Sequence, residues 1–166
     1  MPEILTPPKV IRTPFDRGSV IGTFKFRQGA APTSRGLIHQ EGGGAHVIPG
    51  RPGDWPDPPE DAAGRAEWEA DIAWSVKRAL TGQTPPSLRV LSYLFARSED
   101  HGDRLVVLRA EFSPDPSGAE LEEIGVAQSE VAADFVYRCR VVMELRGLAP
   151  SEEPDPWPLV AYRATG

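Results

Sequence analysis

Residues 88–112, LRVLSYLFARSEDHGDRLVVLRAEF, contain two apolar runs around a short polar segment. The runs Leu88 to Arg97 and Arg104 to Phe112 are rich in valine, leucine and aromatic residues, and the six residues between them are typical of a turn. This pattern predicts a β-hairpin, although periodicity alone does not distinguish such short apolar runs from buried helix. Because both runs are apolar at most positions, we expect inner strands that are covered on both faces.

A helix is predicted before this hairpin. Asp57-Pro58-Pro59-Glu60 is a helix start signal, and Gly82 followed by Pro85-Pro86 is a stop signal, so we expect a helix from about Pro58 to Thr81. Its apolar positions recur at spacings of three and four: Trp68, Ile72, Val76, Ala79 and Leu80. Its polar positions are expected away from this core face: Glu67, Asp71, Lys77 and Arg78.

A second helix is predicted after the hairpin. Ser117-Gly118-Ala119-Glu120 is a capping box, and the helical pattern continues to about Phe135. The inward positions are Leu121, Ile124, Val131 and Phe135, and the outward positions are Glu122, Glu123, Glu130 and Asp134. We expect this acidic outer face to be solvated.

The C-terminal part of the chain predicts two more strands. From Tyr137 to Leu145 apolar and charged residues alternate, which is typical of a half-buried strand, and Leu159 to Arg163 is expected as a short edge strand. Cys139, the single cysteine, is predicted to be a buried structural thiol in the first of these strands, with Arg138 and Arg140 on the opposite face.

The N-terminal part has a different composition. Residues 1–59 contain ten prolines and nine glycines, which disfavour long regular elements. We therefore divide the chain into an arm, residues 1–56, and a folded domain, residues 57–166. Short strands are expected in the arm at Val20 to Arg27, Gly36 to Gln40 and Ala45 to Pro49.

These elements predict an α+β fold with two helices on one face of a mainly antiparallel sheet. If the strand at Val20 to Arg27 joined that sheet, the order would be the βαββαβ of a ferredoxin-like fold.

Charge and cysteine content narrow the classes of function. Residues 1–59 carry seven basic and five acidic residues, a net +2, whereas residues 60–166 carry 11 and 19, a net −8. An acidic domain is expected to bind nucleic acid poorly, because the phosphates repel it, but it could bind a basic protein partner. With a single cysteine, no signal-peptide pattern and no apolar run long enough for a membrane, we expect a cytoplasmic protein that does not bind membranes.

No catalytic or metal-binding pattern is found in the sequence. His39, His46 and His101 match no zinc spacing and are expected to be exposed loop residues, and there is no Gly-x-Ser-x-Gly motif. Gly42-Gly43-Gly44 is expected to be a flexible turn because it lacks the lysine and helix of a phosphate loop. We therefore expect no metal and no cofactor.

The candidate partner-binding residues are the four outward acids of the second helix and one tryptophan: Glu122, Glu123, Glu130, Asp134 and Trp74. Trp68 lies on the core face, but Trp74 does not, so it either packs under the arm or belongs to a partner interface.

Three short stretches carry a resemblance to known proteins. They are residues 78–82 (RALTG), 85–90 (PPSLRV) and 129–135 (SEVAADF). From about Val76 to Arg163 the chain resembles small, acidic bacterial proteins that look like the immunity partners of polymorphic toxins. The resemblance implies a helix, two strands, an acidic helix and one or two strands. It implies no active site, because its motifs are structural, and the Pro/Gly-rich arm departs from it.

We therefore expect a non-enzymatic, immunity-like domain that neutralises or regulates a protein partner through its acidic surface. The alternative is a structural subunit whose arm is draped over its neighbours in an assembly. A small enzyme with a site assembled only in space is a third possibility.

Overall fold

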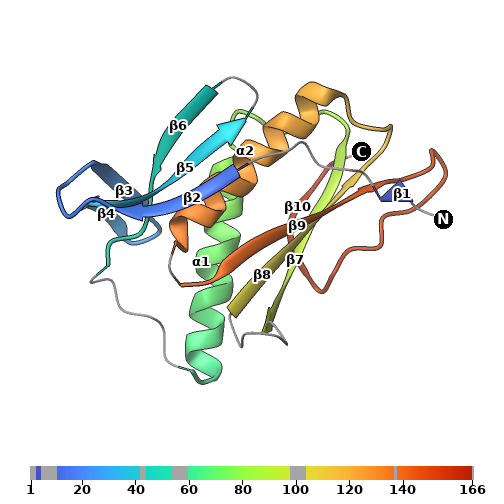
Figure 1. Cartoon of the computed structure of the whole chain (residues 1–166). Coiled ribbons are helices and arrows are strands. Elements are labelled where there is room, and N and C mark those ends of the chain that lie inside the picture. The colour runs from blue at the N-terminus through green and yellow to red at the C-terminus, as the bar shows by residue number, and fades with distance from the viewer. Residues whose placement is uncertain are drawn as a thin grey trace.

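The computed structural model of the chain describes residues 3–4, 11–41, 44–53, 60–97, 104–136 and 138–165. The fold is α+β, and its sheets are mainly antiparallel. In Figure 1 two helices lie between a set of small sheets and a larger sheet. Neither described helix is long and apolar enough to cross a membrane.

The larger sheet has five strands in the order β1-β9-β8-β7-β10. They are β1 (Glu3–Ile4), β7 (Leu88–Arg97), β8 (Arg104–Phe112), β9 (Arg140–Gly147) and β10 (Leu159–Arg163). The predicted hairpin is confirmed, because β7 and β8 are antiparallel neighbours in the interior of the sheet. β8 and β9 are parallel, which needs a crossover connection, and the chain between them contains a helix.

Both helices pack on one face of this sheet. They are α1 (Ala62–Leu80) and α2 (Gly118–Asp134). The apolar residues predicted to face the core do so, and they pack against alternate residues of β8, all 0% exposed: Val106, Leu108, Ala110 and Phe112. The boundaries of α2 and its Ser117 capping box are confirmed.

The predicted start of the first helix is wrong. α1 begins at Ala62, and its N-cap is Asp61, whose carboxylate accepts a hydrogen bond from the Gly64 N–H across 2.8 Å. Asp61 supplies the same capping chemistry that the sequence pattern assigns to Asp57, four residues earlier.

The opposite face of the sheet is covered by residues 148–158, which lack regular structure. The Trp157 N–H donates to Ser92 Oγ, and the Arg109 guanidinium lies 4.1 Å from the centre of the Trp157 ring. Glu111, which is 0% exposed, pairs with Arg146 at 3.0 Å. The inner strands are thus covered on both faces only at this end, because Leu94, Ala96, Leu105 and Val107 are half-buried.

Residues 11–49 of the arm fold into two small antiparallel sheets, whereas β1, at the start of the arm, belongs to the larger sheet. One contains β2 (Ile11–Asp16), β5 (Arg35–Glu41) and β6 (Gly44–Pro49), and the other contains β3 (Gly22–Phe26) and β4 (Gly29–Thr33). The three strands predicted in the arm are present as β3, β5 and β6. Because β3 pairs with β4 and not with the main sheet, the ferredoxin-like order is not formed.

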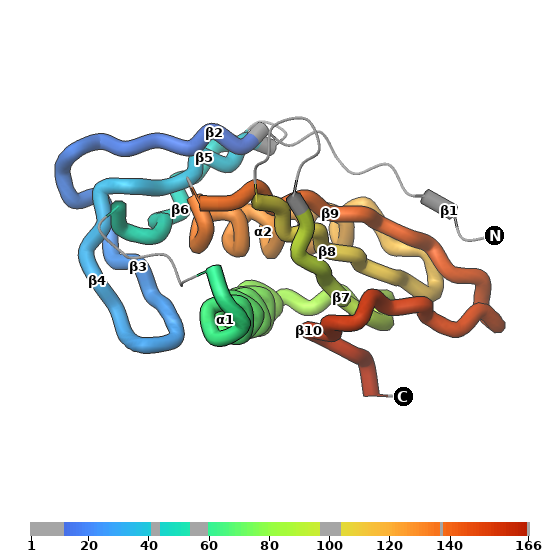
Figure 2. Tube along the Cα trace, turned by 90° about the horizontal axis from the view of Figure 1, so that it is seen from below, coloured from blue at the N-terminus to red at the C-terminus, as the bar shows by residue number. Residues whose placement is uncertain are grey.

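The arm packs against α2 of its own chain. Strands β5 and β6 contact α2, and the Arg51 N–H donates to the Ala133 carbonyl across 3.2 Å. At Gly50 a Cβ atom would lie 2.7 Å from that same carbonyl, so the close approach requires glycine. In Figure 2, where α1 is seen nearly end-on, the small sheets and the main sheet lie on opposite sides of the helices.

Candidate functional site

The five residues predicted to bind a partner do not share one surface. Glu122 is exposed, whereas Glu123, Glu130 and Trp74 are half-buried. Asp134 is only 3% exposed, so its predicted position on a solvated face is wrong. The physical reason is that its side chain faces α1, where Ser75 and Arg78 contact it.

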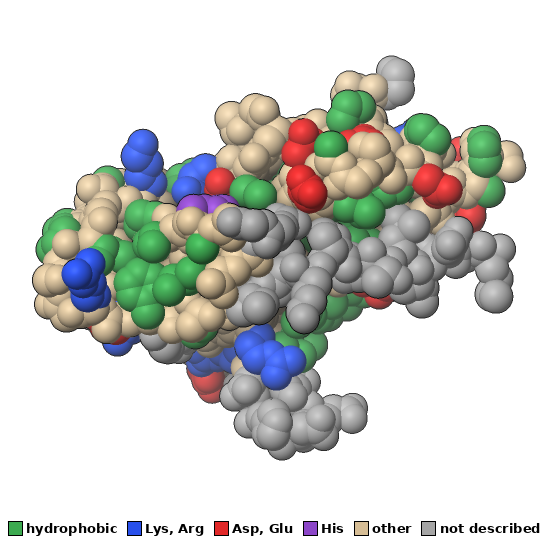
Figure 3. Space-filling view, turned by 45° about the horizontal axis from the view of Figure 1, so that its top comes forward, with side chains coloured by type: hydrophobic (Ala, Val, Ile, Leu, Met, Phe, Trp, Pro, Cys, Tyr) green, Lys and Arg blue, Asp and Glu red, His purple; other side chains and the backbone are tan. Residues whose placement is uncertain are grey.

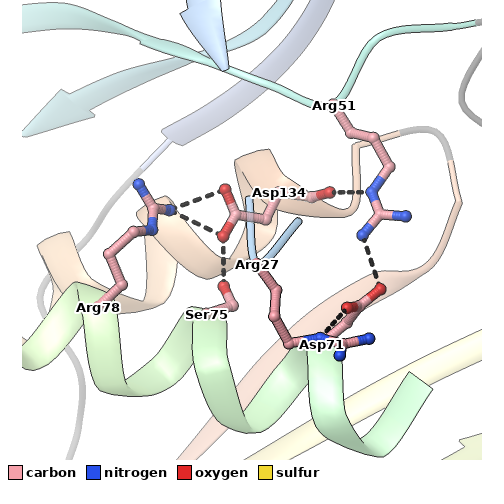
Figure 4. Close-up of polar contacts among 6 residues, drawn as sticks. All are labelled: Arg27, Arg51, Asp71, Ser75, Arg78 and Asp134. Carbon is pink, nitrogen blue, oxygen red and sulfur yellow. Dashed lines mark hydrogen bonds and ion pairs between the residues drawn. The ribbon is translucent and has the colours of Figure 1, made fainter. Parts of the chain in front are cut away.

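Asp134 instead belongs to a buried polar network between the two helices (Figure 4). Its carboxylate accepts a hydrogen bond from Ser75 Oγ at 2.5 Å, and Arg78 Nη2 lies 2.8 Å from both of its oxygens. The Arg78 guanidinium also lies 5.4 Å from the centre of the Trp74 ring. Burial raises the pKa of Asp134 to about 6, although Arg78 and Ser75 oppose the shift.

Asp71 is a second buried carboxylate in this network. It was expected on the polar side of the first helix, yet it is 6% exposed, because two arginines of the arm cover it. Arg27 Nε donates to Asp71 Oδ1 across 2.9 Å, and Arg51 Nη2 donates to Asp71 Oδ2 across 3.3 Å. Arg51 Nε also donates to the main-chain carbonyl of Asp134, so one arm residue contacts both helices.

The hydrogen bonds and ion pairs of this network link the arm to both helices. Both carboxylates are less than a tenth exposed, and the arm and Arg78 supply the cations around them. Buried charges are stable only when they are paired. The opposite net charges of the two parts of the sequence are therefore partly matched inside the molecule.

A histidine–serine pair lies on the other side of α2. His39, predicted to be exposed, is a 1% exposed residue of β5, and its Nδ1 lies 2.5 Å from Ser129 Oγ. The Ser129 hydroxyl donates to the Gly125 carbonyl and accepts a hydrogen bond from Arg12 Nε. Because both side chains are buried and Ser129 Oγ also contacts the Gly125 carbonyl of its own helix, this pair positions the arm on α2.

The histidines in the described part of the chain form no metal-binding cluster. His46 is exposed, and its ring lies 4.8 Å from that of His39, while His101 lies outside the described residues. In the described part of the chain, no group of three or more His, Cys, Asp or Glu side chains is arranged to hold a metal ion. Trp55, Gly42 and Gly43 also lie outside the described residues.

Two segments rich in acidic residues begin at one end of the main sheet. Phe112 and Gly147 are paired at the ends of β8 and β9, and the Leu148 N–H donates to the Phe112 carbonyl across 2.8 Å. Residues 113–123 and 148–156 therefore leave the sheet side by side. The first segment contains four acidic residues, the second contains three, and neither contains lysine or arginine.

We call five of these residues the acidic end surface: Asp115, Glu122, Glu123, Glu152 and Glu153. All five are exposed or half-buried. Figure 3 shows acidic side chains spread over this end of the molecule. Of these five residues, only Glu122 and Glu123 were predicted from the sequence to bind a partner. The place of residues 148–156 beside them depends on the parallel pairing of β8 and β9, which the sequence does not predict.

Cys139 precedes β9 and is half-buried, so the prediction of a fully buried thiol within the strand is wrong. Its side chain packs at the edge of the core. It lines two adjoining hollows, both of which also include Arg104.

Comparison of the chain with known protein families, with curated proteins and with solved structures gives no significant match.

Proposed function

We propose that the protein is a non-enzymatic, immunity-like binding domain that neutralises or regulates a basic protein partner through the acidic end surface. The observation that carries the proposal is that two acidic segments, residues 113–123 and 148–156, follow the paired ends of β8 and β9 and contain no lysine or arginine. The proposal keeps the cytoplasmic location expected from the sequence.

The electrostatics of the acidic end surface support a protein partner. Exposed carboxylates of one sign produce a field that attracts a cationic surface and accelerates association at low ionic strength. The same field repels the phosphates of nucleic acid. Within the acidic end surface, Glu122 and Glu153 are exposed, so a partner can reach them without displacing the arm.

The test is a pull-down from the native host at low and at high salt, followed by binding measurements with the purified partner. We expect a partner that is retained at low salt and weakened at high salt, as exposed charges are screened. Glu122→Lys together with Glu153→Lys is expected to reduce its affinity by about tenfold or more.

Glu67→Lys is the matched control, because Glu67 is an exposed glutamate on α1, away from the acidic end surface. Absence of a partner at both salt concentrations, or equal weakening by Glu67→Lys, would refute the proposal.

A second candidate is a structural subunit of an assembly. The described part of the arm folds on its own chain, so contact with neighbours would use its outer surface. Val20 and Val47, which are 69% and 52% exposed, favour this candidate, and Figure 3 shows hydrophobic side chains gathered over the arm. Val47→Asp would then abolish self-association measured by sedimentation velocity, whereas Glu122→Lys would leave it unchanged.

A further inference from the structure

The outer edge of β6 is open to a further strand. In the described part of the chain β6 pairs with β5 alone, and Figure 1 shows it at the margin of its sheet. The two strands pair without a bulge, and the Gly50 N–H donates to the Arg35 carbonyl across 2.9 Å. Hydrogen-bonded and non-hydrogen-bonded pairs alternate in an antiparallel ladder. Counted from Gly50, the main-chain N–H and C=O of Val47 therefore point away from β5, towards the open edge.

A groove of about 310 Å³ lies along this edge. Four consecutive residues of β6, His46 to Pro49, line it. Its other described lining residues come from β3, α1 and α2, and they are Thr23, Lys25, Arg78 and Glu130. The start of β3 is packed against the end of β6, since a Cβ atom at Gly22 would lie 3.0 Å from Pro49 Cγ. The groove thus combines a strand edge with side chains from three other elements.

Charged side chains in this groove retain bonding capacity. Lys25 is exposed and Glu130 is half-buried, and neither forms an ion pair with a described residue. Arg78 contacts Asp134 through Nη2 alone, as Figure 4 shows, and its Nε has no hydrogen-bond partner in the described part of the chain. Because Asp134 already balances the charge of Arg78, Lys25 supplies the uncompensated positive charge. An ammonium group beside a guanidinium group matches a carboxylate ligand.

We propose that this groove binds an extended peptide segment that carries a carboxylate. The segment would add a fourth strand to the sheet of β2, β5 and β6 and exchange main-chain hydrogen bonds with Val47. Its carboxylate would bind to Lys25 beside Arg78. The Val47 side chain, which is 52% exposed, would gain a cross-strand contact.

The surroundings of the edge favour a peptide over a second folded copy. Side chains of β3, α1 and α2 line the groove beside β6, and a single extended strand can enter between them. A second copy would bring its own β3 and helices against these walls. No lining residue belongs to the acidic end surface, so the inference does not depend on the proposed function.

The first test is titration of isotope-labelled protein with short peptides of one β-forming sequence, followed by NMR. Acetyl-TVTV with a free C-terminus and acetyl-TVTVE amide carry the carboxylate at the chain end and on a side chain, respectively. Acetyl-TVTV amide carries none. We expect saturable binding of at least one carboxylate peptide, and binding of the neutral amide that is weaker by about tenfold or more. The tighter of the two carboxylate peptides identifies the source of the carboxylate.

Amide hydrogen exchange measures strand addition directly. The N–H groups of His46 and Ile48 are directed at β5, so they should be protected with and without peptide. The Val47 N–H should exchange rapidly in the free protein and become protected when a carboxylate peptide binds. A peptide with N-methylated alternate amides keeps the charge but loses donors, and it is expected to bind about tenfold more weakly or worse.

Lys25→Gln is the principal variant, because an exposed side chain can be replaced without disturbing the core. It is expected to weaken the carboxylate peptides by about tenfold and to leave the neutral amide unchanged. Lys77→Gln is the matched control, since Lys77 is an exposed lysine of α1 that does not line the groove.

Val47→Pro removes the outward N–H without removing a hydrogen bond to β5, and a proline is tolerated on an edge strand. It is expected to abolish peptide binding, whereas Val47→Thr, which keeps the N–H, should bind. Thermal unfolding followed by circular dichroism would establish that all variants are folded.

Four outcomes would overturn the inference. The first is no saturable binding of either carboxylate peptide, and the second is equal binding of the N-methylated peptide, which would place the ligand away from the strand edge. The third is equal weakening by Lys25→Gln and Lys77→Gln, which would indicate general screening of charge. The fourth is protection of the Val47 amide that rises with protein concentration without peptide, which would assign the edge to a second copy of the chain.

Discussion

Arg51 Nη2 of the arm lies 3.3 Å from Asp71 Oδ2 of α1, inside the molecule. The two side chains are 4% and 7% exposed, so neither charge has more than slight contact with water. The Arg51 guanidinium also lies 5.2 Å from the centre of the Phe135 ring, a cation–π contact with the core. The arm is therefore an integral part of the folded domain and not an appendage to it.

Asp71→Ala is expected to lower the free energy of unfolding by about 3 kcal/mol, because it leaves the Arg51 charge buried without its carboxylate. Arg27→Ala is the comparison, since the Arg27 side chain is 37% exposed and the loss of such a pair costs about 1 kcal/mol or less. Urea denaturation of the two variants and the wild type would measure the difference. If the two variants lost the same free energy of unfolding, burial would not determine how much the Arg51–Asp71 contact contributes to stability.

Gly50→Ala is expected to separate the arm from α2. The new Cβ would lie 2.7 Å from both the Ala133 carbonyl oxygen and Val136 Cγ1, so the backbone would have to shift. We expect a loss of about 2 kcal/mol and faster proteolysis within the arm. Gly118→Ala is the matched control, because a Cβ there meets no atom within 4 Å. Unchanged proteolysis of Gly50→Ala would contradict the described packing.

Asp134 is expected to make stability fall as the pH rises from 4 to 7. Its pKa rises from 3.8 to about 6 on folding, so between these values the folded protein holds a proton that the unfolded chain releases. Its favourable contribution is thus complete below pH 3.8 and is lost above pH 6. This change in the pKa of Asp134 corresponds to roughly 3 kcal/mol of stability.

The check is urea denaturation of the wild type and Asp134→Asn at several pH values. The other titrating groups are common to both proteins, so the difference between them isolates Asp134. A difference that does not change with pH would mean that Arg78 and Ser75 fully offset the burial of the carboxylate.

Glu120 is expected to have the opposite dependence. Hydrogen bonds from the Ser87 hydroxyl and the Ser117 N–H lower its pKa from 4.5 to about 2. Its stabilising contribution is present above pH 4.5 and is lost as the pH falls towards 2. The melting temperature of the wild type should therefore exceed that of Glu120→Gln by a constant amount above pH 5, and the two should converge near pH 2. A gap that persists at pH 2 would contradict this account.

The folded domain was largely predictable because its signals are local. The hairpin at Leu88 to Phe112 and the capping box at Ser117 each depend on neighbouring residues, and the structure confirms them. The parallel pairing of β8 with β9 is not local, and no nearby residue specifies it.

The candidate site was only partly predictable, for the same reason. Asp134 and Asp71 have the spacing of solvated helix residues. Asp71 is buried because Arg27 and Arg51 of the arm lie over it, and Asp134 is buried against Arg78 of the neighbouring helix. His39 was likewise assigned to an exposed loop because its partner, Ser129, is 90 residues away in the sequence. The opposite net charges of the arm and the domain were the one available signal that the two parts attract each other.

The parallel pairing of β8 and β9 has a further consequence. Both strands run from the end of the sheet where Leu105 is paired with Arg140 to the acidic end surface. β8 spans nine residues, so these two ends of the sheet are on the order of 25 Å apart. A partner bound at the acidic end surface would therefore be held at a fixed distance from the opposite end of the sheet.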